Sequence, residues 1–149
     1  MDIALITVGK VKDAALSARI ADYVERISHD ARIECKLVRD EGDKGREGGR
    51  IIETIDSLSR KSPSLVVALS EEGRSLSSVE FSRMIGGANK RVVFVVGGPF
   101  GLSDAVKTRA DTLLSLSRMT FPHEMARLMV AEQVYRALSI LKNRKYHKE

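Results

Sequence analysis

Two short runs of consecutive apolar residues constrain the fold of this chain most strongly. Residues 65–69 (LVVAL) and residues 92–96 (VVFVV) contain no polar side chain. Runs of this length are typical of strands that are covered on both faces, as in a parallel sheet. Both are far too short to cross a membrane. The sequence therefore predicts a sheet that is buried between two layers of helices.

The rest of the chain alternates strand-like and helix-like patterns. Further strands are predicted at residues 3–8, 33–37 and 112–116, and helices at about residues 13–27 and 51–58. The charged, glycine-rich residues 39–49 are predicted to form a loop. Ser77 and Glu80 have the spacing of a capping box, which predicts a helix after Ser77. The alternation of strands and helices predicts an α/β fold, an open and mostly parallel sheet flanked by helices. No linker or repeat is visible, so residues 1–149 are expected to form one domain.

The last predicted helix, at about residues 124–141, is apolar on two sides. One stripe contains Met125, Leu128, Tyr135 and Leu138, and the other contains Val130, Val134, Ala137 and Leu141. A helix with two apolar sides has to bury both of them. We expect one side to cover the sheet and the other, through the stripe that contains Val134, to meet a second copy in a homodimer.

The positive charge of the chain is concentrated at its C-terminus. The formal net charge is +5, and residues 142–149 contain four of the 25 Lys and Arg side chains and one acidic residue. A basic tail that also carries Tyr146 and His147 is a plausible contact for nucleic acid. A solvated, frayed C-terminus is the alternative. The chain opens Met1-Asp2 without the basic start of a secretory signal, so a soluble, cytoplasmic protein is expected.

Several familiar catalytic and cofactor motifs fail on their spacing. Cys35 is the only cysteine, so neither an intrachain disulfide nor a cysteine-based zinc site is expected. His123-Glu124 begins like the zinc-binding motif HExxH, but Arg127 stands in place of the second histidine. Residues 97–101 (GGPFG) do not match GxGxxG. Metal, ATP and nicotinamide sites are therefore not expected.

Three loops follow the last three predicted strands. They comprise residues 69–73, 97–101 and 116–122. In open α/β sheets, ligands bind outside the carboxyl ends of the strands, where these loops would meet. The sequence therefore predicts a small-ligand site, with ordinary turns as the alternative for any single loop.

Longer motifs along the whole chain resemble a known family. The pieces are GGPFGLS at residues 97–103, LSLSRMTFPHEMARLMVAEQVYRA at residues 114–137 and the terminal YHK. IALITVGKVKD near the start and LSEEGRSLSSVEF in the middle also match in position. The chain thus resembles the ribosomal large-subunit pseudouridine N3-methyltransferases, the methyltransferase H family of the SPOUT (α/β-knot) superfamily.

The resemblance implies a fold and an activity that periodicity alone does not predict. The fold would contain a C-terminal trefoil knot, and two copies would form a homodimer with composite active sites. The enzyme would transfer a methyl group from S-adenosyl-L-methionine to N3 of a pseudouridine in 23S rRNA, on assembled ribosomes. The sulfonium of that cofactor already activates the methyl group, so no metal is needed.

Site residues carried over from the resemblance fall into three groups. The expected cofactor-binding residues are Leu69, Gly97, Leu116, Ser117, Arg118, Met119, Thr120 and Phe121. The expected catalytic residues are His147, a candidate base because a neutral imidazole can accept a proton, and Tyr146, which could stack on or hydrogen-bond the base. The expected contacts to RNA phosphates are Arg127, Arg136, Arg144 and Lys145. For Arg136, a surface pair with Glu132 is the alternative.

Some points stay open at the level of sequence. A non-catalytic RNA-binding or ribosome-associated module of the same fold is the rival function, and the same chemistry on tRNA is a third possibility. His147 could act as a base or only position the pseudouridine, and the tail could act on its own chain's site or on a partner's. Lys145 stands where the family usually has proline, which should leave the tail more mobile before RNA binds.

Overall fold

The computed structural model describes residues 1–148 and contains a five-stranded sheet. The strands are β1 (Asp2–Val8), β2 (Arg32–Val38), β3 (Ser64–Ser75), β4 (Arg91–Val96) and β5 (Thr112–Ser115). Their order across the sheet is β2-β1-β4-β3-β5, and every neighbouring pair is parallel. The predicted parallel sheet is therefore confirmed, with β3 and β4 side by side near its centre.

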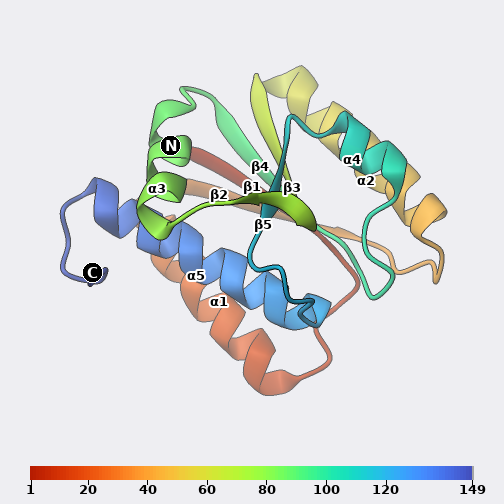
Figure 1. The fold of residues 1–149 in the computed structure, drawn as a ribbon, viewed down its shortest axis with the longest axis horizontal. Coiled ribbons are helices and arrows are strands. Elements are labelled where there is room, and N and C mark those ends of the chain that lie inside the picture. Colours follow the sequence, from red (N-terminus) through yellow and green to blue (C-terminus); the bar gives the residue numbers. More distant parts are fainter. Residues whose placement is uncertain (149) are drawn as a thin grey trace.

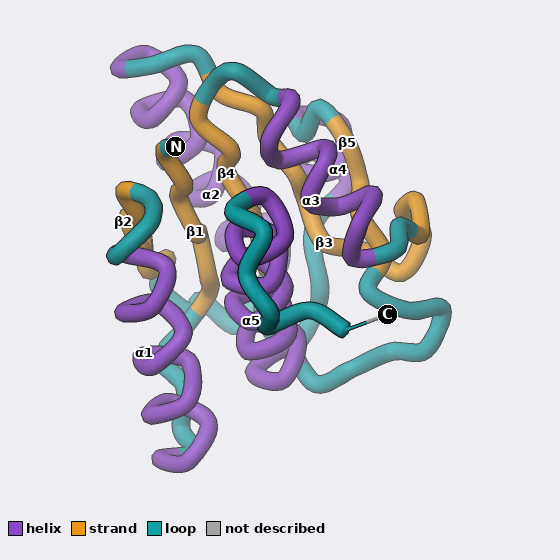
Figure 2. Tube along the Cα trace, turned by 90° about the vertical axis from the view of Figure 1, so that its left-hand side faces the viewer, coloured by secondary structure: helices purple, strands orange, loops and turns teal. Residues whose placement is uncertain are grey.

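Helices cover both faces of this sheet. They are α1 (Ala14–Ser28), α2 (Lys44–Lys61), α3 (Ser78–Gly87), α4 (Asp104–Arg109) and α5 (His123–Leu141). α1, α3 and α5 lie on one face, and α2 and α4 lie on the other (Figures 1 and 2). This confirms the predicted α/β class and element order, whereas the trefoil knot stays a prediction. No helix within residues 1–148 is long and apolar enough to cross a membrane.

The two apolar runs form the centre of two hydrophobic cores. Val92, Phe94 and Val96 pack on the side of α1, α3 and α5, while Val93 and Val95 pack on the side of α2 and α4. All five are buried, as the absence of polar residues in the run predicts. The capping box before α3 is also confirmed, because Ser77 Oγ accepts the Glu80 amide and the Glu80 carboxylate accepts the Ser77 amide.

Residues 44–49 are helical, so the prediction of a loop over residues 39–49 is wrong in its second half. Asp43 caps α2 and accepts hydrogen bonds from the backbone amides of Gly45 and Arg46. Gly48 faces α4, where an added Cβ atom would lie 2.3 Å from Ser103 Oγ. This glycine allows two helices to approach closely and does not mark a loop.

The stripe of α5 that contains Val134 packs against the protein's own sheet. Val130, Val134 and Ala137 are each at most 2% exposed and belong to the same core as β4. The prediction that this stripe meets a partner is therefore wrong. The apolar side chains that stay accessible on α5 are Met125, which is 44% exposed, and Leu141, which is 40% exposed.

Candidate functional site

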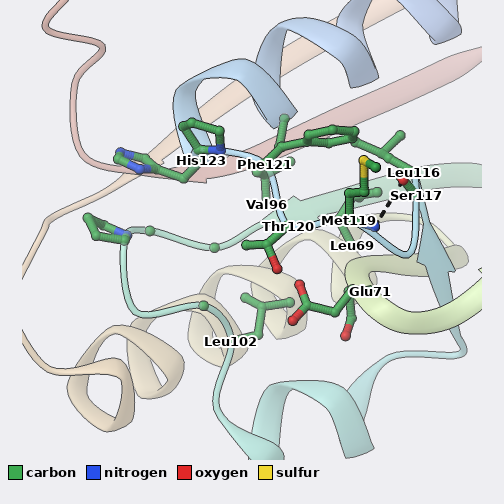
Figure 3. Close-up of a pocket in the computed structure, with 17 residues that line it drawn as sticks. Leu69, Glu71, Val96, Leu102, Leu116, Ser117, Met119, Thr120, Phe121 and His123 are labelled. Atoms are coloured by element: carbon green, nitrogen blue, oxygen red, sulfur yellow. Dashed lines mark hydrogen bonds between the residues drawn. The ribbon is translucent and has the colours of Figure 1, made fainter.

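A cavity of about 540 Å³ lies at the carboxyl edge of the sheet. Its walls come from the middle of β3, from the loops that follow β4 and β5, and from the first residues of α5 (Figure 3). These three strands are neighbours in the sheet, so their ends open at the same place. The prediction that the three segments meet is confirmed, but residues 69–73 belong to β3 and do not form a loop after it, because the strand continues to Ser75.

The loop after β4 exposes its backbone to this cavity. Gly101 has a φ of 77° and its amide donates to the Gly98 carbonyl at 3.0 Å. A Cβ atom on Gly97 would lie 2.9 Å from the carbonyl carbon of Gly101. The turn is therefore so tight that a side chain at Gly97 would reshape it.

The loop after β5 is held by its own serines. Ser115 Oγ donates to the Ser117 carbonyl at 2.8 Å, and Ser117 Oγ accepts the Met119 amide at 3.0 Å. Phe121 and Pro122 then lead the chain into α5 along the wall of the cavity. These local bonds give the loop a defined shape without any ligand.

Seven of the eight expected cofactor-binding residues line this cavity. They are Leu69, Gly97, Leu116, Ser117, Met119, Thr120 and Phe121. Arg118 lies on the same loop, but its side chain is exposed and does not line the cavity. The cavity also contains Glu71, Leu102 and His123, which the sequence analysis did not assign. Their positions inside or beside the three loops are the only signal that could have identified them.

The C-terminal tail turns back sharply at the end of α5. Asn143 adopts a left-handed conformation with φ of 54°. Its amide donates to the Ile140 carbonyl, and the Arg144 amide donates to the Ser139 carbonyl at 2.8 Å. This is the Schellman arrangement, in which asparagine can replace the usual glycine. The tail is thereby directed back toward α5 and α1.

Tyr146 is held in a cluster formed by α1 and α5. Its hydroxyl donates to Glu132 Oε1 at 3.0 Å and lies 3.1 Å from the hydroxyl of Tyr23. Its ring meets Tyr135 edge-on, with 4.8 Å between the ring centroids. Burial, followed by the hydrogen bonds with Tyr23 and Glu132, raises the pKa of Tyr146. Tyr146 therefore stays protonated and can serve as a hydrogen-bond donor.

Arg136 connects this cluster to His147. Its Nε donates to Glu132 Oε1 at 3.0 Å, which confirms the i, i+4 pair considered as the alternative to RNA binding. Its guanidinium also lies 4.8 Å from the centroid of the Tyr146 ring, and Nη1 lies 3.2 Å from His147 Nδ1. Because arginine has only donors, His147 Nδ1 has to be the acceptor.

Arg127 lies inside the protein and is not available to RNA as predicted. It is 6% exposed, and its Nη2 donates to the carbonyls of Val8 and Gly9, each at 2.9 Å. Burial lowers the pKa of its guanidinium. The arginine holds α5 against the end of β1, so the structure contradicts its assignment to a phosphate contact.

The other predicted RNA contacts lie at the start of the tail. Arg144 makes a two-pronged salt bridge with Asp30, at 2.6 and 2.7 Å, and Lys142 binds the same carboxylate at 2.9 Å. Lys145 is exposed. The side chain of Arg144 is still 46% exposed, so its bond to Asp30 leaves part of it accessible.

The cluster around Tyr146 and Arg136 lies toward the end of α5, and the cavity lies at its start. His123 lines the cavity, and Arg136 is thirteen residues further along the helix. At 1.5 Å per residue this separates them by about 20 Å. The structure therefore does not bring Tyr146 and His147 to the cavity of their own chain.

Within residues 1–148, no group of three or more His, Cys, Asp or Glu side chains could hold a metal ion.

Sequence comparisons match the whole chain to one group of proteins. A family model described as "Predicted SPOUT methyltransferase" covers residues 1–147. The ribosomal RNA large subunit methyltransferase H of Clostridium botulinum strain Langeland is 40% identical over 164 residues, covering 99% of this chain and 100% of that protein. The protein of the same name from Christiangramia forsetii is 38% identical over 160 residues, covering 99% of each chain.

Solved structures resemble this fold at low sequence identity. A probable methylase family protein from Haemophilus influenzae aligns with a TM-score of 0.61 at 16% identity, over 99% of this chain and 70% of that one. The SpoU methyltransferase AviRb from Streptomyces viridochromogenes, in complex with the cofactor AdoMet, aligns with a TM-score of 0.58 at 11% identity. That alignment covers 97% of this chain and 59% of AviRb.

Proposed function

This chain belongs to the SPOUT methyltransferase family, and we propose that it methylates N3 of a pseudouridine in 23S rRNA with S-adenosyl-L-methionine as the methyl donor. The observation that carries this proposal is the cavity, because seven of the eight residues expected at a cofactor site line it. The ribosomal RNA methyltransferases H that align over their full length support the choice of rRNA as the substrate class. In this proposal residues 1–149 act as one methyltransferase domain, in the cytoplasm with the ribosomes.

The cavity has the chemistry that an adenosyl group requires. Leu69, Leu116 and Phe121 provide apolar surface, and the glycine-rich loop after β4 leaves backbone donors and acceptors accessible. S-adenosyl-L-methionine supplies a methyl group that its sulfonium cation has already activated. The walls of the cavity have to bind that group and keep the reactive methyl oriented toward the base.

The tail residues would bind and orient the pseudouridine. His147 Nδ1 accepts from Arg136, so the proton of the neutral ring lies on Nε2. Nε2 can then donate to a carbonyl oxygen of the base. The hydroxyl of Tyr146 donates its one proton to Glu132, so Tyr146 would stack on the base or accept a hydrogen bond from it. In this geometry His147 would position N3 for methylation. The N–C bond would form as the S–C bond of the methyl donor breaks, the N3 proton would pass to solvent, and the neutral thioether S-adenosyl-L-homocysteine would leave.

We propose a homodimer because the tail is about 20 Å, measured along α5, from the cavity of its own chain. In a two-fold pair with antiparallel α5 helices, the tail of one chain would lie beside the cavity of the other. The uncovered apolar surface suits such a pair. Met125 on α5 is 44% exposed, and Leu16, Ile20 and Val24 on α1 are only partly buried.

A cavity-filling variant with a matched control tests the proposed function. Thr120→Trp should block the cavity, and Arg118→Trp on the same loop should not, because Arg118 does not line it. S-adenosyl-L-methionine at about 100 times its Kd should raise the unfolding free energy of the wild type by about 2.7 kcal/mol. For a chain of this size that raises Tm by about 5–10 °C. We expect the same shift with Arg118→Trp and none with Thr120→Trp.

Methylation of ribosomes by the wild type completes the test. Transfer of a labelled methyl group to 23S rRNA in 70S particles, lost in Thr120→Trp and kept in Arg118→Trp, is the expected result. Binding of ribosomes without cofactor binding would instead support the non-catalytic RNA-binding module. Methylation of tRNA in place of ribosomes would assign the same chemistry to another substrate.

A further inference from the structure

Glu71 is the only acidic side chain among the described residues that line the cavity. The remaining wall consists of apolar side chains, glycine backbone, hydroxyl groups and the imidazole of His123, with no Lys or Arg. Figure 3 shows the Glu71 carboxylate pointing into the cavity, on the side of the Thr120 hydroxyl. The cavity therefore contains a negative charge although the chain has a formal net charge of +5.

A bulge in β3 directs Glu71 toward the cavity. Leu69 and Arg74 both pair with Leu114 of β5, so the four residues between them leave the strand ladder. Gly73 allows the chain to return to the sheet, because a Cβ atom there would lie 2.5 Å from the carbonyl carbon of Leu113. A bulge of this kind re-aims side chains that regular pairing would place on the faces of the sheet.

The neighbours of Glu71 in the bulge point elsewhere. Ser70 Oγ accepts the backbone amide of Glu72 at 3.2 Å, which fixes the turn. The Glu72 carboxylate forms a salt bridge with Lys107 Nζ at 3.3 Å. Within residues 1–148, no cationic side chain forms such a pair with Glu71. The bulge thus sends one carboxylate to a lysine of α4 and leaves the other free to attract a positive ligand.

The methyl donor and its product differ by one charge at the reacting sulfur. S-adenosyl-L-methionine contains a sulfonium cation, and S-adenosyl-L-homocysteine contains a neutral thioether at the same position. The adenosine, the ammonium group and the carboxylate are common to both molecules. A carboxylate in the cavity therefore attracts the donor more strongly than the product through the charge alone, apart from any contact with the methyl group.

We propose that Glu71 makes the cavity select S-adenosyl-L-methionine over S-adenosyl-L-homocysteine and so favours release of the product. This selectivity rests on the proposed function of the cavity. Two unit charges 4 Å apart in a medium as polar as water attract by about 1 kcal/mol, which corresponds to about a five-fold change in affinity. Glu71 is exposed at the mouth of the cavity, so this high-dielectric value is the appropriate scale.

Isothermal titration of Glu71→Gln with three ligands tests the proposal. The ligands are S-adenosyl-L-methionine, S-adenosyl-L-homocysteine and sinefungin, in which a charged amine replaces the methylsulfonium. We expect Glu71→Gln to weaken the two cationic ligands about five-fold and the thioether less than about two-fold. Glu72→Gln is the matched control, since it removes the adjacent carboxylate that binds Lys107. It should leave all three affinities unchanged.

Charge reversal extends the test, and unfolding curves without ligand confirm that each variant is folded. Glu71→Lys should weaken the cationic ligands further and leave binding of the thioether almost intact. Equal losses for all three ligands, or no loss at all, would overturn the selectivity. A wild type that binds neither the donor nor the product would instead overturn the proposed function of the cavity.

Discussion

Arg127 lies inside the protein with its guanidinium bonded to the backbone where β1 ends. The Val8 and Gly9 carbonyls point toward α5, and Arg127 satisfies both of them with one nitrogen. Buried carbonyls without a donor are costly, so this arginine stabilises the junction of sheet and helix. At the scale of single residues, the surroundings of a side chain decide its role more than its charge does.

Replacing Arg127 with methionine should therefore destabilise the fold. The variant leaves the carbonyls of Val8 and Gly9 without their donor, and hydrogen bonds to a charged group are each worth about 1.5–3 kcal/mol. We expect a loss of about 2–4 kcal/mol in the free energy of unfolding, measured in urea. Arg118→Met, at an exposed position, should change it by less than about 0.5 kcal/mol. If Arg127→Met were as stable as the wild type but bound ribosomes more weakly, Arg127 would contact RNA as the sequence predicted.

The attachment of the tail should depend on pH through Asp30. Hydrogen bonds from Arg144 and then Lys142 lower the pKa of this carboxyl from 3.8 to about 2. Since its pKa is lower in the folded state, the carboxylate stabilises the attachment above about pH 4 and loses this effect as the pH falls toward 2. As the pH falls from about 4 toward 2, the tail should become more mobile, and the ¹⁵N heteronuclear NOE of residues 142–148 should decrease.

Asp30→Asn provides the control for this titration. The variant should have a mobile tail already at neutral pH, because the amide cannot form the same salt bridges. A tail that stays rigid in Asp30→Asn would show that the tyrosine cluster alone holds it in place.

At the scale of elements, α5 is a helix with three neighbours. The sheet covers Val130 and Val134, and α1 and α3 lie against its flanks. Enough of its apolar surface is covered within one chain that two-sided apolarity does not by itself require a partner. The most exposed apolar side chains of α5 lie at its two ends, Met125 in the first turn (44% exposed) and Leu141 in the last (40% exposed).

Two aspartate substitutions on α5 should therefore have different effects. Val134→Asp places an unpaired charge in the core and should unfold the chain, with a loss of at least about 3 kcal/mol. Met125→Asp should leave the fold intact and dissociate the proposed dimer. Light scattering and circular dichroism separate the two effects. A Met125→Asp protein that is still dimeric at micromolar concentration would move the interface elsewhere.

At the scale of the whole molecule, the cavity and the tail lie too far apart to work together within one chain. α5 separates them by about 20 Å, and the tail is fixed by Asp30 and the tyrosine cluster. A site shared between two chains resolves this separation, since each chain would then supply the cavity of one site and the tail of the other.

Mixing two inactive variants tests the shared site. His147→Ala should lower the methylation rate with little change in cofactor affinity, and Thr120→Trp should abolish cofactor binding. If subunits exchange freely, half of the dimers are mixed, and one of the two sites in each mixed dimer is intact. Activity should recover to about a quarter of the wild type. A mixture no more active than its parents would place each site within one chain.

The sequence by itself determined the order of the elements, the parallel sheet and the meeting of three segments at one edge, although the first of them, residues 69–73, is part of β3. Apolar runs and helical periods are local signals, and in a parallel sheet the carboxyl ends of neighbouring strands open at the same edge. The resemblance identified seven residues that line the cavity because their motif is continuous along the chain.

Only the tertiary structure decided which neighbour each ambiguous residue meets. Position 48 of α2 is a glycine because Ser103 leaves no room for a side chain, and Val134 is buried because the sheet covers it. Arg127 is internal because it lies against the carbonyls that end β1. Glu71 reaches the cavity because a bulge in β3 interrupts its pairing with β5. Each outcome depends on contacts between segments far apart in the sequence, and no local pattern encodes which surface will fill the space beside a given residue.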